Sequence, residues 1–136
     1  MQPVFAVPIR IYYEDTDAGG VVYHANYLKF LERARTEWLR ALGFEQDELA
    51  SRDHIVFAVR SAALDYLKPV RFNELIEATA AVTARTRTSV TFRQTIRRGD
   101  VVVCEAEVRV VCIDNRSFTP SPLPERLVER IEGVKA

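Results

Sequence analysis

The chain has 136 residues, of which 48% are hydrophobic and 28% charged, so it can bury a core and suits a single domain over residues 1–136. Nineteen basic residues balance nineteen acidic ones. This balance argues against a nucleic-acid partner, because phosphate neutralisation needs a cationic surplus. No run approaches the roughly 18 consecutive apolar residues of a membrane-spanning helix, and the first residues lack the features of a secretory signal. We therefore expect a cytoplasmic protein without an integral membrane segment.

The first part of the chain predicts a strand, a turn and one long helix. Residues 5–13 are rich in β-branched and aromatic side chains, which favours a strand. Residues 14–20 are acidic and turn-forming, and they end in two glycines that let another chain or a ligand approach closely. From 24 to 42 apolar residues recur at steps of three and four, which predicts a helix, and Gly43 stands where a left-handed C-cap is expected.

The remainder of the chain is mostly strand. Alternation of apolar and polar residues predicts strands over 74–85, 88–98 and 101–113, the last two joined by a hairpin turn. The apolar run 55–67 predicts a further strand, and 123–131 is expected to form a short closing helix. One strand, one long helix and four more strands predict an α+β domain, in which a five-stranded antiparallel sheet covers the helix.

The two faces of this sheet are expected to differ. Alternate positions from Ile76 to Ala84 and even positions from 102 to 112 are apolar and define the inner face. Cys104 and Cys112 belong to it, and we interpret them as buried thiols, not as a disulfide or a metal site. Odd positions, Val103 among them, mix apolar and charged residues on the outer face. Such a face suggests contact with another subunit.

Several standard catalytic devices are missing from the sequence. There is no G-x-S-x-G motif, which excludes a serine hydrolase of that type. There is also no glycine-rich loop of the kinds that hold nucleotide phosphates. The two histidines, His24 and His54, lie far apart in the sequence, so we expect no metal site.

The residues that remain lie between positions 13 and 35. Asp17 stands on the glycine turn that leads into the long helix. A helix start has unpaired N–H groups and a partial positive charge, so it can stabilise an oxyanion that forms on a carbonyl. A carboxylate beside it can attack the carbonyl carbon or activate a water molecule. Each residue also has a simpler interpretation. Asp17 suits an N-cap or turn former and His24 a first-turn residue. Glu32 and Arg35 suit surface or intersubunit ion pairs.

Two strings in this region carry a family resemblance. They are YYEDTDAGGVVYHANYL over 12–28 and ERAR over 32–35. Together they resemble the signature of the 4-hydroxybenzoyl-CoA thioesterase family and, within it, most closely the Tol-Pal-associated acyl-CoA thioesterases. The likeness extends from about Pro8 to Pro124. It implies the hotdog fold, hydrolysis of an acyl-CoA to free acid and CoA without a cofactor, and a homodimer or homotetramer.

The resemblance also implies roles for individual residues. It makes Asp17 the catalytic carboxylate, as general base or nucleophile, and places Tyr13 and His24 in the same pocket. The backbone N–H of His24 matches the oxyanion donor of the family. The positions implied in substrate binding are Gly19, Gly20, Val22 and Tyr23 and, for the CoA nucleotide near a strand-to-strand connection, Arg87 and Ser89.

Three alternatives stay open at this point. A hotdog hydratase or dehydratase would use His24 and Asp17 for proton transfer on a hydroxyacyl thioester. A non-catalytic acyl-thioester-binding module would use the pocket for binding alone. A thioesterase of the predicted kind would also act on acyl groups carried by acyl carrier protein, because that protein presents the same phosphopantetheine arm as CoA.

Overall fold

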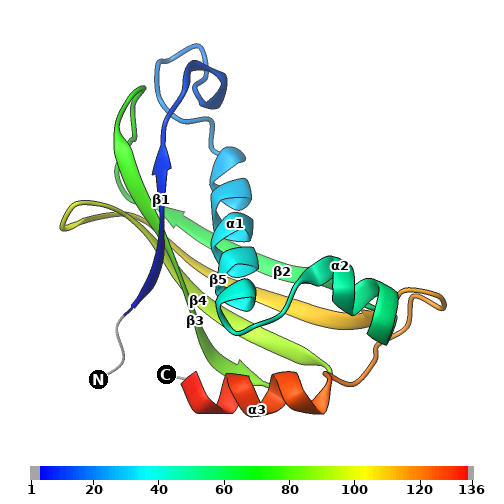
Figure 1. The fold of residues 1–136 in the computed structure, drawn as a ribbon. Coiled ribbons are helices and arrows are strands. Elements are labelled where there is room, and N and C mark those ends of the chain that lie inside the picture. The colour runs from blue at the N-terminus through cyan, green and yellow to red at the C-terminus, as the bar shows by residue number, and fades with distance from the viewer. Residues whose placement is uncertain (1–3, 135–136) are drawn as a thin grey trace.

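The computed structural model describes residues 4–134, in which five strands form one antiparallel sheet (Figure 1). The order across the sheet is β1-β3-β4-β5-β2, so that β1 and β2 are the edge strands. This confirms the predicted α+β class and the five-stranded sheet. The strands are β1 (Phe5–Arg10), β2 (Ile55–Tyr66), β3 (Leu75–Arg85), β4 (Ser89–Arg98) and β5 (Val101–Asp114), and the helices are α1 (Asn26–Ala41), α2 (Gln46–Glu48) and α3 (Glu125–Val134).

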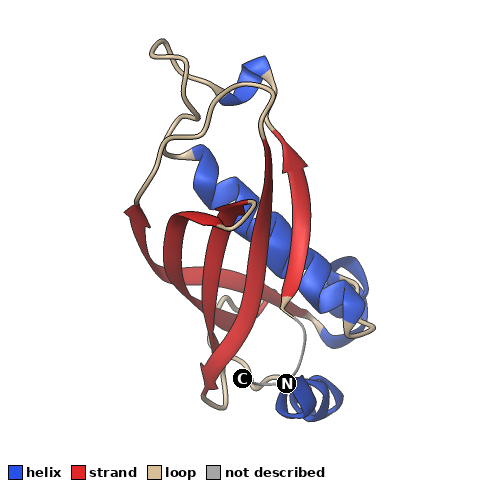
Figure 2. Ribbon diagram, turned by 90° about the vertical axis from the view of Figure 1, so that its left-hand side faces the viewer, coloured by secondary structure: helices blue, strands red, loops and turns tan. Residues whose placement is uncertain are grey.

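The sheet curves around α1, and the main core lies between them (Figure 2). On the helix, Phe30, Leu31 and Ala34 are buried, as the three- and four-residue spacing predicts. The predicted stripe also included Leu28, which is 45% exposed and lies outside the core. No helix within residues 4–134 is long and apolar enough to cross a membrane.

Several boundaries differ from those predicted, for local reasons. β1 ends at Arg10 because the chain then enters a single 3₁₀ turn over Tyr13–Asp15. α1 begins at Asn26 instead of position 24. α2 and the π-helical turn that follows it at Leu49–Asp53 were not predicted, since one turn is too short to show a periodic pattern.

Two face assignments were wrong, and a β-bulge accounts for each. Ala84 was expected on the inner face, but the register between β3 and β4 shifts after Val82 and leaves Ala84 exposed. Val103 was expected on the outer face, but the register between β4 and β5 skips it and it is fully buried. An inserted residue reverses the faces of those that follow, which alternation alone does not reveal.

A buried polar side chain joins the helix to the sheet. Gln94 of β4 is fully buried on the inner face. Its Nε2 donates to the carbonyls of Leu31 (3.0 Å) and Thr79 (2.9 Å). Its Oε1 accepts a hydrogen bond from Arg35 Nη1 at 3.0 Å. One amide therefore connects α1, β3 and β4.

The two edges of the sheet are unequal. β1 is 6 residues long and contains Pro8, which has no N–H to offer to another strand. β2 is 12 residues long, and positions 59–63 within it are all exposed. Of the two edge strands within residues 4–134, only β2 therefore presents a long exposed edge.

The predicted C-cap of α1 is confirmed, and it supports a stability prediction. Gly43 has a φ of +97°, and its N–H donates to Arg40 O at 2.9 Å. A side chain is strained at this φ, so Gly43→Ala is expected to lower the free energy of unfolding by about 1 kcal/mol, measured by urea denaturation. Gly133→Ala in α3 is the control, since no positive φ occurs there and nothing lies within 4 Å of the added Cβ. Equal stability in both variants would contradict the expected strain.

Candidate active site

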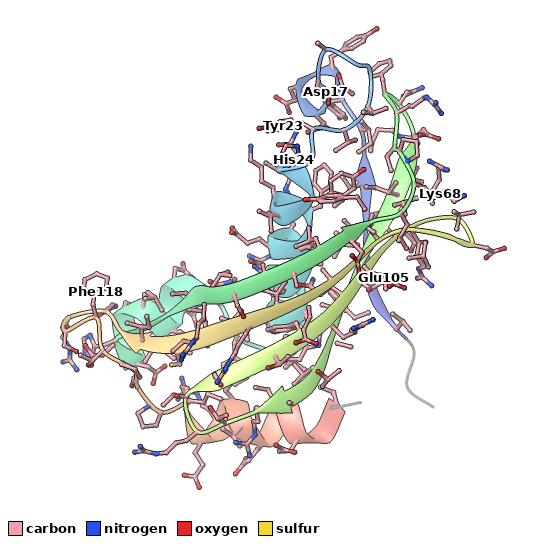
Figure 3. All side chains as sticks on the ribbon, turned by 180° about the vertical axis from the view of Figure 1, so that it is seen from behind. Asp17, Tyr23, His24, Lys68, Glu105 and Phe118 are labelled. Carbon is pink, nitrogen blue, oxygen red and sulfur yellow. The ribbon has the colours of Figure 1, made fainter. Side chains whose placement is uncertain are left out.

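The loop between β1 and α1 is held at the end of the molecule where α1 begins (Figure 3). Isolated bridges join Thr16 to Val22 and Val21 to Arg71. The N–H of Val22 also donates to Val70 O at 2.8 Å. The loop therefore lies against the segment that follows β2, although about 50 positions separate them in the sequence.

A hollow of about 270 Å³ opens at this junction. We call it the Asp17 hollow. The structure thus brings together Asp17, His24 and Val22 from the predicted set. It adds residues from the end of β2 and beyond that the sequence did not indicate. The full lining is Asp17, Val21, Val22, His24, Tyr27, Tyr66, Leu67, Lys68 and Pro69.

Two glycines set the direction of the Asp17 carboxylate. The N–H of Asp17 donates to Val21 O at 2.9 Å, and Gly20 closes the turn with a φ of +79°. Oδ1 of Asp17 accepts a hydrogen bond from the N–H of Gly19 at 2.8 Å. A Cβ on residue 19 would lie 3.2 Å from that oxygen, so this position favours glycine. Oδ2 of Asp17 has no hydrogen-bond partner among residues 4–134.

The two oxygens of the carboxylate have different surroundings. Oδ1 serves the turn, as the simpler interpretation of Asp17 expected, while Oδ2 has no hydrogen-bond partner among residues 4–134. The N-cap interpretation is wrong, because α1 has Ala25 at its N-cap and no side-chain cap.

The start of α1 carries free backbone donors. Tyr23 O accepts a hydrogen bond from the N–H of Asn26 at 2.9 Å. The side chain of Asn26 donates to Asp15 O, also at 2.9 Å, which fixes the turn before the helix. The backbone N–H groups of His24 and Ala25 have no acceptor in the part of the chain that the structure describes. Two donors thus stand unpaired at the positive end of a helix, an arrangement that suits an anion or an oxyanion.

Two aromatic side chains, Tyr27 and Tyr66, line part of the Asp17 hollow. Tyr66 donates its hydroxyl to His24 O at 2.9 Å, and its ring packs edge-on to Tyr27 with centroids 5.2 Å apart. Burial raises the pKa of Tyr27 to about 12 and also raises the pKa of Tyr66. Both phenols therefore stay protonated and neutral near pH 7. Lys68 adds a cation to the lining.

Two predicted aromatic residues lie outside the hollow. Tyr13 is 76% exposed and stacks on Phe72, with ring centroids 3.8 Å apart. The two rings line a separate hollow. Tyr23 is 45% exposed, and its ring packs against that of His24 at 4.6 Å. Within one chain, the side chain of Tyr13 is therefore not brought to Asp17.

The residues predicted for the CoA nucleotide lie at the other end of the sheet. Arg87 is exposed in the connection between β3 and β4. Ser89 is buried, and its hydroxyl is 2.7 Å from Thr86 Oγ1. β3 begins beside the loop between β1 and α1 and runs away from it. The connection between β3 and β4 is therefore distant from the Asp17 of its own chain (Figure 1).

A second cavity, of about 190 Å³, lies between α1 and the inner face of the sheet near α3. Glu32 and Arg35 line it together with apolar residues such as Phe57 and Phe92. Neither charged residue forms an ion pair within residues 4–134. Burial lowers the pKa of Arg35, which the carboxylate of Glu32 partly opposes. The cavity shares no lining residue with the Asp17 hollow.

Comparison with known proteins identifies the family. Residues 19–105 match the model of the thioesterase superfamily. The chain is similar to the acyl-CoA thioesterase YbgC of Haemophilus influenzae, with 40% identity over 131 residues, 96% of each chain. It is also similar to the acyl-CoA thioester hydrolase YbgC of Escherichia coli O6:H1, with 44% identity over 126 residues, 92% of this chain and 93% of that protein.

A solved structure agrees with these relatives. The probable thioesterase from Bartonella henselae superposes with a TM-score of 0.86 at 31% identity, covering 90% of this chain and 100% of that one. The sheet that curves around α1 is thus the hotdog fold that the two sequence strings implied. Sequence, fold and relatives agree that this chain belongs to the thioesterase superfamily.

Proposed function

We propose that the protein hydrolyses acyl-CoA thioesters to a free acid and CoA in the Asp17 hollow. One observation carries the proposal: the free Oδ2 of Asp17 shares an end of the molecule with the unpaired N–H groups of His24 and Ala25. A relative named acyl-CoA thioesterase, which matches 96% of this chain at 40% identity, supports the same activity. The family match begins at residue 19, so the role of Asp17 rests on its geometry.

In the proposed reaction, the thioester carbonyl oxygen faces the start of α1. The N–H groups there donate to this oxygen and stabilise the negative charge that forms on it. Asp17 then takes a proton from a water molecule that attacks the carbonyl carbon, or attacks that carbon itself to form a mixed anhydride that water cleaves. In both routes the C–S bond breaks, and CoA leaves as the thiolate and takes up a proton. The imidazole of His24 positions the water or the thioester, while the role of Tyr13 stays a prediction.

We propose that two copies pair along β2 to form at least a homodimer. β2 is a long edge strand with exposed positions 59–63, and Val59 within it is 53% exposed. A row of unpaired backbone groups of this length favours pairing with another strand. Because Arg87 lies far from the Asp17 of its own chain, we expect it to contact a CoA that is bound at the Asp17 of a second copy. Sedimentation should give the mass of two or four chains, and the mass of one chain would contradict the pairing.

We propose CoA as the carrier of the acyl group and the cytoplasm as the compartment. Cys104 and Cys112 are buried and unpaired, which favours a reducing environment. Burial raises the pKa of each thiol to about 11, so neither is a nucleophile at neutral pH. The hydrolysis rates of the same acyl group on CoA and on acyl carrier protein test the carrier. If the thioester on acyl carrier protein is hydrolysed tenfold faster, acyl carrier protein is the carrier instead of CoA.

A thiol-release assay over acyl-CoAs of increasing length, with one aromatic member, tests the activity. We expect one free thiol for each thioester consumed. A change at the acyl double bond without thiol release would indicate a hydratase. Tight binding of every acyl-CoA without turnover would indicate a binding module.

A further inference from the structure

Tyr66 connects the end of an edge strand to the start of α1. It is the last residue of β2, and its hydroxyl reaches the carbonyl of His24, 42 positions away, at 2.9 Å. Its ring is held edge-on to Tyr27 and to His24, at interplanar angles of 71° and 84°. The ring contacts place the hydroxyl, and the hydroxyl in turn fixes the His24 carbonyl.

The carbonyls before α1 determine where the free N–H groups point. The C=O and N–H of a trans peptide point in opposite directions, and no peptide bond in residues 4–134 is cis. Tyr23 O is held by Asn26, which sets the plane of the peptide that carries the His24 N–H. His24 O is held by Tyr66, which sets the plane of the peptide that carries the Ala25 N–H. Each free donor thus belongs to a peptide whose carbonyl is already bound.

We propose that Tyr66 is a positioning residue for hydrolysis, which fixes the His24–Ala25 peptide so that the Ala25 N–H acts as a second oxyanion donor beside that of His24. This proposal rests on the proposed function and adds a donor and its support to it. A hydrogen bond to a carbonyl also polarises the N–H of the same peptide, which makes it a stronger donor. A donor held in place before reaction needs no reorganisation when the oxyanion forms.

The position of Tyr66 indicates that its hydroxyl acts on the site and does not merely fill space in the core. Its side chain lines the Asp17 hollow, and the residue is 49% exposed, so the hydroxyl is not part of the core. Burial of the ring raises the pKa of Tyr66, so the hydroxyl keeps its proton throughout the neutral range. Loss of the hydroxyl alone should therefore change the site more than the stability.

Tyr66→Phe keeps the ring and removes the donor. We expect kcat for acyl-CoA hydrolysis to fall about tenfold, less than for loss of a whole oxyanion donor, with KM within about twofold and Tm unchanged. Affinity for an S-alkyl-CoA thioether, which has no carbonyl oxygen, should equal that of the unaltered protein. Tyr12→Phe is the matched control, since Tyr12 is 61% exposed outside the Asp17 hollow and should leave kcat unchanged.

A second measurement uses the unaltered protein, so it does not depend on whether a variant folds. A CoA analogue with a trifluoromethyl ketone in place of the thioester carbonyl presents an oxyanion-like oxygen to the donors. In an NMR titration it should move the amide protons of both His24 and Ala25 downfield. A shift at His24 alone would overturn the second donor.

The outcomes distinguish this proposal from the function beneath it. If the unaltered protein releases no thiol, the proposed function fails and the role of Tyr66 fails with it. If the unaltered protein is active and Tyr66→Phe keeps its kcat, the role of Tyr66 alone is overturned. A raised KM with an unchanged kcat also overturns it, because this pattern indicates lost substrate binding.

Discussion

Asp17→Asn is expected to lower kcat for acyl-CoA hydrolysis by roughly 10²–10⁴-fold without unfolding the protein. Asparagine keeps the shape of the side chain, and its Oδ1 still accepts the hydrogen bond from Gly19 that is 2.8 Å long in the native turn. It removes the charge at Oδ2, so the residue no longer takes a proton from water or attacks a carbonyl carbon. The donors at His24 and Ala25 remain, so a small residual rate above that in buffer is expected.

The chain offers a matched control for this substitution. Asp47 is also exposed, and its Oδ1 also accepts a backbone hydrogen bond, from Glu48 at 2.9 Å. Asp47→Asn should leave kcat unchanged, because Asp47 lies beyond the C-terminal end of α1. Thermal melting followed by circular dichroism should show the same Tm for both variants. A native kcat in Asp17→Asn would rule out the carboxylate as base or nucleophile.

Gln94→Met is expected to lower the free energy of unfolding by about 3 kcal/mol. Methionine fills a similar volume but forms none of the three hydrogen bonds that connect Gln94 to Leu31, Thr79 and Arg35. Each buried partner left unsatisfied costs about 1–3 kcal/mol, and a charged guanidinium costs more than a carbonyl. For a domain of this size the loss corresponds to a fall in Tm of roughly 10 °C.

Gln46 provides the comparison for Gln94, because its amide is exposed and donates to Thr36 Oγ1 at 3.1 Å. Gln46→Met should change the free energy of unfolding by less than about 0.5 kcal/mol. Urea denaturation and calorimetry measure both variants. Equal stabilities for the two methionine variants would show that the buried amide adds nothing beyond its volume.

The sequence predicted the elements better than their faces. α1 and the long strands have periods that are visible over many residues, so their existence and order were correct. A bulge adds one residue without changing the residue types around it, and therefore Ala84 and Val103 were placed on the wrong faces. Gln94 was not singled out, although a polar residue between apolar positions 92 and 96 was the available signal for a buried hydrogen-bonding group.

The residues of the candidate site were also predicted only in part. Asp17 and His24 stand in one short string, so local sequence was enough to indicate both. Tyr66 and Lys68 enter the hollow only because the chain after β2 folds back onto the site loop. No local pattern marks such residues, because tertiary contact alone gives them their position. Sequence patterns also did not predict that the side chain of Tyr13 is exposed or that Ser89 is buried.

The inequality of the two sheet edges limits how far an assembly grows. A sheet with two open margins adds copy after copy and becomes a fibre. Here one edge is β1, which is short and contains Pro8 and therefore disfavours pairing, and the other edge is β2. If β2 of one molecule pairs with β2 of another, neither molecule keeps an exposed long edge strand. In the proposed dimer, growth through backbone pairing therefore ends at two chains, and a larger assembly would form through side-chain contacts.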